Sequence, residues 1–230
     1  MTTALNGSPA GRVAIVTGGS RGVGRATIRR LAASGYAVVV NYLHDQRAAE
    51  SAVEAILAGN GDAVAVRADV ADDLDVERLF AETIAAFGGV DAVVHAVGGQ
   101  ITAAPLAGAG LDEFDALARI NTRATFIVNR EAARRVRNGG AVVNLASSAE
   151  GPSLATHGLY AATRAATDVL TRALALELRE RSITVNAVSL EADRPCAPDR
   201  VADVIAYLLS DQGHHLTGQV LGVGDLELRP

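Results

Sequence analysis

The chain has 230 residues, 49% of them hydrophobic and 20% charged, and its 21 basic and 26 acidic residues give a net charge of −5 at pH 7. This composition excludes intrinsic disorder, and the acidic balance excludes binding to nucleic acid or an anionic membrane by bulk electrostatics. The single cysteine, Cys196, excludes an internal disulfide, and no cluster of cysteine and histidine suggests a metal site. Because no signal-peptide pattern and no membrane-spanning apolar run are present, we expect a cytoplasmic protein.

Short apolar runs alternate with amphipathic segments along the whole chain. Continuous apolar runs are typical of strands that are buried on both faces of a parallel sheet. The segments between them carry apolar residues at helical spacing and often end at glycine. We predict strands at 13–16, 37–40, 64–67, 92–94, 142–145, 184–188 and 220–223, with helices at 25–33, 46–57, 76–87, 111–137, 160–181 and 200–209.

Repeated βα units of this kind predict an α/β fold with a doubly wound parallel sheet, of the Rossmann type. The chain contains no linker-like stretch and no low-complexity segment. We therefore expect one domain spanning residues 1–230, which carries both a cofactor site and the catalytic residues.

A glycine-rich turn, Thr17-Gly18-Gly19-Ser20-Arg21-Gly22-Val23-Gly24, joins the first predicted strand to the first helix. Glycine is needed where the backbone approaches a pyrophosphate and where the helix packs closely on the strand. The helix N-terminus adds free N–H groups and a partial positive charge. At the first βα turn, we interpret this pattern as a dinucleotide-binding loop rather than an ordinary structural turn.

The spacing Thr-Gly-x-x-x-Gly-x-Gly resembles that of the short-chain dehydrogenase/reductase family, and motifs along most of the chain agree with it in order. They include Asp69-Val70, Ile120-Asn121-Thr122, Asn144-Leu145-Ala146-Ser147, Tyr160-Ala161-Ala162-Thr163-Arg164, Val185-Asn186-Ala187-Val188 and Thr217-Gly218-Gln219. The resemblance implies catalytic roles for Asn121, Ser147, Tyr160 and Arg164. It also implies cofactor contacts from Thr17, Gly18, Ser20, Arg21, Gly22, Val23, Gly24, Asn41, Tyr42, Asp69, Val70, Ala96, Gly98, Tyr160 and Arg164.

The charge around the second predicted strand indicates which cofactor is used. A carboxylate at the end of that strand would bind a ribose 2′-hydroxyl and repel a 2′-phosphate. Asn41 and Tyr42 occupy this position instead, and Arg21 in the glycine-rich loop can form a charge-assisted bond to a phosphate. In the family this combination is found with NADP(H), which we therefore expect here.

The family mechanism assigns a proton-transfer role to Tyr160, substrate-oxygen binding to Ser147 and a water-linked proton path to Asn121. A phenol with a pKa of about 10 needs a nearby positive charge to stabilise its anion. The family supplies a lysine, whereas this chain has Arg164, one helical turn after Tyr160. An arginine keeps the charge but is bulkier and does not release a proton.

Three further positions depart from the family pattern. His95-Ala96-Val97-Gly98 replaces Asn-Asn-Ala-Gly, and we interpret His95 as a hydrogen-bonded residue at a strand end rather than a catalyst. Leu190-Glu191 replaces Pro-Gly and brings a carboxylate toward the cofactor. Only the segment 192–199 stands where the family has a longer substrate-covering region, so water exclusion should be weaker.

These features predict an NADPH-dependent reductase of a ketone or enone, acting on a small-molecule or carrier-bound carbonyl compound. The alternative is a non-redox protein on the same scaffold, either a cofactor-binding pseudoenzyme partner or a dehydratase or cyclase. An apolar stripe along the helix at 160–181 also resembles a family subunit interface and predicts a homodimer or homotetramer. The stripe consists of Ala166, Val169, Leu170, Ala173 and Leu174.

Overall fold

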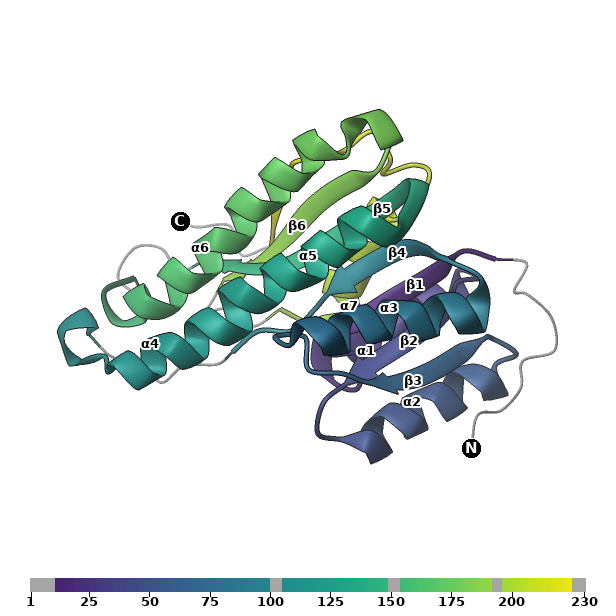
Figure 1. The fold of residues 1–230 in the computed structure, drawn as a ribbon, viewed down its shortest axis with the longest axis horizontal. Helices are drawn as coiled ribbons and strands as arrows, with labels where there is room; N and C mark the ends of the chain where they lie inside the picture. The colour runs from purple at the N-terminus through teal and green to yellow at the C-terminus, as the bar shows by residue number, and fades with distance from the viewer. Residues whose placement is uncertain (1–10, 100–104, 149–153, 192–195, 225–230) are drawn as a thin grey trace.

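A seven-stranded sheet forms the centre of the molecule in the computed structural model (Figure 1). The structure describes residues 11–99, 105–148, 154–191 and 196–224, without the side chains of Ser148 and Glu191. The strand order is β3-β2-β1-β4-β5-β6-β7, and every neighbouring pair is parallel. The predicted doubly wound α/β sheet is therefore confirmed. The strands are β1 (Val13–Thr17), β2 (Ala37–Tyr42), β3 (Ala63–Arg67), β4 (Val90–His95), β5 (Val136–Ser148), β6 (Thr184–Glu191) and β7 (Val220–Val223).

Helices cover both faces of the sheet and bury two apolar clusters against it. One cluster lies under α3 (Asp73–Phe87), α5 (Ala124–Arg135) and α6 (Leu154–Glu177), which lie side by side in Figure 1. The other lies under α1 (Gly22–Ala33), α2 (Gln46–Ala58) and α7 (Pro198–Leu208). Since both faces are covered, the strands need apolar residues on both sides, as the apolar run of β1 shows.

The chain reverses its direction of travel across the sheet between β1 and β4. It first adds β2 and β3 on one side of β1, and then returns to place β4 on the other side. In sheets of this kind ligands bind in the crevice outside the carboxyl ends of the strands, at this point of reversal. The glycine-rich turn after β1 and the segment after β4 meet there.

The single long helix predicted at 111–137 is wrong. The structure has α4 (Leu111–Leu117), a π-helical turn at Ala118–Arg123, and then α5, which ends at Arg135. Val136 leaves the helix with φ −66 and ψ 134 and begins β5, where it pairs with Val90 of β4. Pairing with a strand that is distant in sequence therefore ends the helix before the predicted boundary.

Several other elements begin before their predicted boundaries. Helix α1 begins at Gly22 rather than residue 25, because the extended backbone of Arg21 provides its N-cap. Helix α3 begins at Asp73, since the Asp72 side chain accepts a hydrogen bond from the N–H of Asp75. Helix α6 begins before residue 160 and ends at Glu177, and a short 3-10 turn at Arg179–Arg181 follows it.

Candidate active site

The glycine-rich loop has the backbone shape that a phosphate site requires. Gly18 and Gly22 have φ values of +64 and +53, in the left-handed region. A Cβ on Gly24 would overlap the carbonyl oxygen of Gly18, so loop and helix pack with no side chain between them. The N-cap residue Arg21 makes no side-chain cap, and the first turn of α1 has no acidic residue. The free N–H groups at this helix end are therefore available to an anion.

Three side chains of the loop have different surroundings. Ser20 is buried within the loop, and Val23 is half-buried in the first turn of α1. The guanidinium of Arg21 is exposed and has no hydrogen bond or ion pair within the described part of the chain. Among those residues Arg21 is therefore an unpaired positive charge, in a loop whose Gly19 N–H bonds to the carbonyl of Asn41 at the end of β2.

Asn41 at the end of β2 holds the loop in place. Its Nδ2 donates to the carbonyl of Ala68 at 3.0 Å, and its Oδ1 accepts from the N–H of Gly18 at 3.4 Å. Its backbone oxygen accepts from the N–H of Gly19 at 3.0 Å. Tyr42, half-buried, ends the strand beside it. Sequence reasoning does not predict that Asn41 fixes the glycine-rich loop, because its hydrogen-bond partners lie in other segments of the chain.

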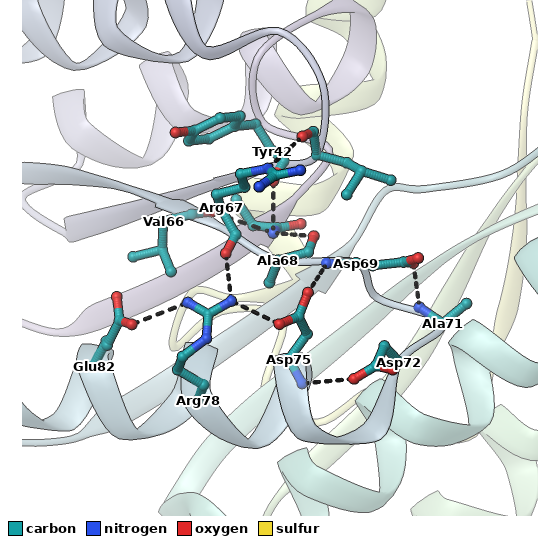
Figure 2. Close-up of polar contacts among 12 residues, drawn as sticks. Tyr42, Val66, Arg67, Ala68, Asp69, Ala71, Asp72, Asp75, Arg78 and Glu82 are labelled. Carbon is teal, nitrogen blue, oxygen red and sulfur yellow. Dashed lines mark hydrogen bonds and ion pairs between the residues drawn. The ribbon is translucent and has the colours of Figure 1, made fainter.

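Asp69, directly after β3, is held from both sides. Its carboxylate accepts from the N–H of Ala71 at 2.9 Å, and its own N–H donates to Asp75 at 2.8 Å (Figure 2). The carboxylate also accepts from Arg119 Nη2 at 2.7 Å. Burial acts to raise the pKa of Asp69, but the hydrogen bonds from Arg119 and Ala71 outweigh it and leave the pKa below its usual value. The side chain of Val70 is buried in the core, so only its backbone is available to a ligand.

His95 at the end of β4 is fully buried and makes a hydrogen bond of 2.9 Å from Nδ1 to the hydroxyl of Thr17. The same hydroxyl accepts from the N–H of Ala96 at 3.0 Å. Burial lowers the pKa of His95 to about 3, and the nearby charge of Arg164 acts in the same direction. The interpretation of His95 as a hydrogen-bonded strand-end residue is therefore confirmed, and its ring is neutral at physiological pH.

Asn121 lies in the π-helical turn and is fully buried. Its Oδ1 accepts from the N–H of Gly99 at 2.9 Å, and its Nδ2 donates to Thr163 Oγ1 at 2.9 Å. Its backbone oxygen accepts from the Thr125 hydroxyl at 2.6 Å. The amide thus joins the segment after β4 to helix α6, on the face that carries the predicted catalytic residues.

Ser147 and Tyr160 lie on different elements at the same edge of the sheet. The hydroxyl of Ser147, near the end of β5, donates to the carbonyl of Leu190 on β6 at 2.9 Å. Its oxygen keeps lone pairs that can accept a further hydrogen bond. Tyr160 is half-buried on α6, three residues after His157, whose φ of −121 and ψ of 18 interrupt the helix.

Arg164 is buried on the inner face of α6 and makes no ion pair within the described residues. Its Nη2 donates to the carbonyl of Leu145, and its Nη1 makes a long contact of 3.5 Å with the carbonyl of Val97. A Cβ on Gly98 would lie 2.8 Å from this Nη1, so the guanidinium packs closely against the glycine. Burial lowers the pKa of Arg164, while the charges of Tyr160 and Asp168 oppose this shift.

The order and direction of the strands define an α/β protein of the Rossmann type. The family model for short chain dehydrogenases matches residues 12–192, and the chain belongs to this family. Versicolorin reductase 1 of Aspergillus parasiticus is 34% identical, over 93% of this chain and 95% of its own. A dehydrogenase/reductase from Sinorhizobium meliloti has a similar crystal structure, with a TM-score of 0.88, 35% identity and 94% of each chain covered.

A blue fluorescent protein from a metagenomic library, solved in complex with NADPH, has a TM-score of 0.85 and 33% identity over 93% of this chain and 96% of its own. Among the described residues, no helix has both the length and the apolar character needed to cross a membrane. No three His, Cys, Asp or Glu side chains in that part of the chain are grouped to hold a metal ion. The side chain of Glu191 and residues 192–195 of the short segment lie outside the described residues.

Proposed function

We propose that this protein is an NADPH-dependent reductase of a ketone or an enone. One observation carries the proposal. The Asn121 amide is hydrogen-bonded both to Gly99 and to Thr163, and Thr163 stands on α6 between Tyr160 and Arg164. Asn121 is therefore tied to the turn of α6 that carries Tyr160 and Arg164, beside the point of chain reversal. The relatives named versicolorin reductase 1 and probable tetrahydroxynaphthalene reductase support a reductase reaction.

The residues around the glycine-rich loop fit NADP(H). The free N–H groups of α1 suit the pyrophosphate, and exposed Arg21 suits a 2′-phosphate, since Asn41 and Tyr42 place no carboxylate there. The solved relative that holds NADPH supports this choice. We assign the cofactor site to Thr17, Gly18, Ser20, Arg21, Gly22, Val23, Gly24, Asn41, Tyr42, Asp69, Val70, Ala96, Gly98, Tyr160 and Arg164.

The catalytic roles follow from the chemistry of each side chain. Bound NADPH supplies a hydride. Tyr160 donates a proton to the carbonyl oxygen of the substrate, and the Ser147 hydroxyl holds that oxygen. The guanidinium of Arg164 acts through its positive charge beside Tyr160 and does not transfer a proton, because an arginine side chain is not deprotonated in proteins. Asn121 positions the segment after β4 against α6.

The substrate and assembly are proposed from the surroundings of the site. A small-molecule or carrier-bound carbonyl compound is the proposed substrate, and a single domain carries both cofactor and catalytic residues. Of the predicted stripe, Val169 is exposed, whereas Leu174 is buried in the chain's own core. Phe126 on α5 and Leu176 on α6 are also exposed apolar side chains. Since such side chains favour burial against a partner, we propose that these helices pack between subunits of a homodimer or homotetramer.

A non-redox activity is the second candidate, and the way Arg164 is used favours it. Both of its terminal nitrogens contact backbone carbonyls rather than facing solvent. If Arg164 keeps these bonds, it stabilises the end of the sheet and does not bind the nicotinamide ribose of the cofactor. A dehydratase or cyclase would then use Tyr160 as an acid or base, whereas a pseudoenzyme partner would only bind the cofactor.

A fluorescence titration with NADPH, followed by turnover assays on aromatic ketones and enones, separates these candidates. The parent should bind NADPH and consume it with substrate. Tyr160→Phe should lower turnover by about 100-fold or more and leave the NADPH Kd unchanged, because it removes only the proton donor. A product formed without NADPH consumption would support the second candidate. Full NADPH oxidation by Tyr160→Phe would refute the role of Tyr160.

A further inference from the structure

Four buried polar atoms beneath helix α6 make no hydrogen bond within the described part of the chain. They are His95 Nε2 at the end of β4, Asn144 Oδ1 on β5, and Arg164 Nε and Thr167 Oγ1 on α6. His95, Asn144 and Thr167 are fully buried, and Arg164 is 3% exposed. Because buried polar groups are almost always hydrogen-bonded in native proteins, these atoms together indicate a partner that is not one of the described residues.

The register of the sheet brings His95 and Asn144 side by side. They are direct partners in the parallel ladder of β4 and β5. Asn144 points toward α6, because its Nδ2 donates to Thr171 Oγ1 on that helix at 3.0 Å. The ring of His95 points to the same face, since Val93, two residues earlier on the strand, packs in the apolar cluster under α3, α5 and α6. Both side chains therefore lie on the face of the sheet that α6 covers.

Helix α6, which packs on β5 and β6, presents the other two atoms to this face. Arg164, Thr167 and Thr171 are buried and recur at helical spacing. Thr171 bonds to Asn144, and Arg164 Nη2 donates to the carbonyl of Leu145, the next residue on β5. Thr167 lies between these two contacts along the helix, so its hydroxyl faces the same part of β5.

The hydrogen-bonding capacity of the four atoms matches that of one water molecule. Arg164 Nε only donates and Asn144 Oδ1 only accepts, whereas the Thr167 hydroxyl and a neutral His95 ring can do either. A buried water typically makes about three hydrogen bonds to polar groups that would otherwise have no partner. The charge of Arg164 repels a cation in this place, and the oxygen of the Asn144 amide repels an anion.

We propose that a single water molecule is bound inside the protein, between the ends of β4 and β5 and helix α6. It accepts from Arg164 Nε and Thr167 Oγ1 and donates to Asn144 Oδ1 and His95 Nε2. This water is separate from the water-linked proton path expected at Asn121, because none of its four contacts is with Asn121 or with a residue whose side chain or N–H bonds to Asn121.

The proposed water fixes the tautomer of His95. Burial is the main cause that lowers the pKa of His95, and the charge of Arg164 is the second, so the guanidinium is near the ring. A lone pair on Nε2 facing this charge is more favourable than an N–H group. The proton of the neutral ring is therefore on Nδ1, which donates to the hydroxyl of Thr17.

A high-resolution crystal structure of the parent tests the site directly. It should show one isolated density peak within hydrogen-bonding distance of at least three of the four atoms. Nitrogen-15 NMR of the labelled protein should find the His95 proton on Nδ1. A direct contact between Arg164 Nε and His95 Nε2, a site without density, or a proton on Nε2 would overturn the proposal.

Thr167→Val tests the same site in solution, because it removes one contact of the water and keeps the shape of the side chain. Urea unfolding should give an unfolding equilibrium constant about fivefold higher than that of the parent, as expected for the loss of one buried hydrogen bond. A variant as stable as the parent would contradict the proposal.

Thr27→Val is the matched control. Thr27 Oγ1 on α1 is also buried and has no partner within the described residues, but no other such side-chain atom lies on the elements that α1 packs against. One polar group does not hold a water, so this substitution should leave the unfolding equilibrium constant unchanged or lower it. An equal loss of stability in Thr27→Val and Thr167→Val would overturn the proposed water site.

Discussion

Acidification should destabilise the protein through His95. The ring is fully buried and its pKa is held at about 3, against 6.5 for an ordinary histidine. Between these values the unfolded chain binds a proton that the folded protein does not bind, so the free energy of unfolding falls as pH falls. From pH 7 to pH 5 the titration of His95 should lower the free energy of unfolding by about 2 kcal/mol, at the usual 1.36 kcal/mol per pKa unit.

Urea unfolding at pH 7 and pH 5, at constant protein concentration, measures this loss. His95→Asn removes the titrating ring and keeps a group that can hydrogen-bond to Thr17. Between pH 7 and pH 5 the variant should therefore lose about 2 kcal/mol less of its free energy of unfolding than the parent loses. Carboxylates with lowered pKa, such as Asp69, weaken the fold in acid in both proteins and cancel in the comparison. His215→Asn, at an exposed position, is the matched control and should behave like the parent.

Equal losses in the parent and in His95→Asn would refute this reasoning. That result would mean that the buried ring takes up a proton in the folded protein despite its surroundings. A loss that continues below pH 5 in the parent, and is again smaller in the variant, would agree with a folded-state pKa of about 3.

Arg21→Ala should weaken NADPH binding about tenfold and leave NADH binding unchanged, because a charge-assisted bond to the 2′-phosphate is lost. Fluorescence titration measures both affinities, and equal affinity of the parent for the two cofactors would contradict this prediction. Arg164→Lys should keep or raise reductase activity, since lysine supplies a smaller cation, and a tenfold fall in kcat with an intact fold would show that the guanidinium itself is required. Light scattering at micromolar concentration should give a dimer or tetramer, and Val169→Asp on the exposed face of α6 should dissociate it. A monomeric parent would contradict the proposed interface.

The sheet could be predicted from sequence because its strands are buried on both faces. Val13 to Val16 and Val38 to Val40 are fully buried in the structure, and they stand out in the sequence as continuous apolar runs. The glycine-rich loop was equally visible, since its conformation depends on residues that are close together in the chain. Local patterns were therefore sufficient for the fold and for the place of the site.

Features that depend on distant partners could not be predicted in this way. The π-helical turn surrounds Asn121, whose amide bonds to Gly99 and Thr163 from separate segments. Nothing in the amphipathic pattern of residues 111–137 distinguishes this turn from an ordinary α-helix. The contacts of Arg164 are with backbone carbonyls, which carry no signature in sequence.

The all-parallel order of the sheet has a consequence for how the chain reaches its fold. Thr17 and His95 are hydrogen-bonded neighbours, although 78 positions separate them, and no two consecutive strands form a hairpin. Parallel pairing needs a crossover each time, so folding depends on contacts of long range and is slow. During synthesis, one edge of β1 stays unpaired until β4 has emerged from the ribosome. A chain released before that point would present an open apolar edge to other chains and should aggregate.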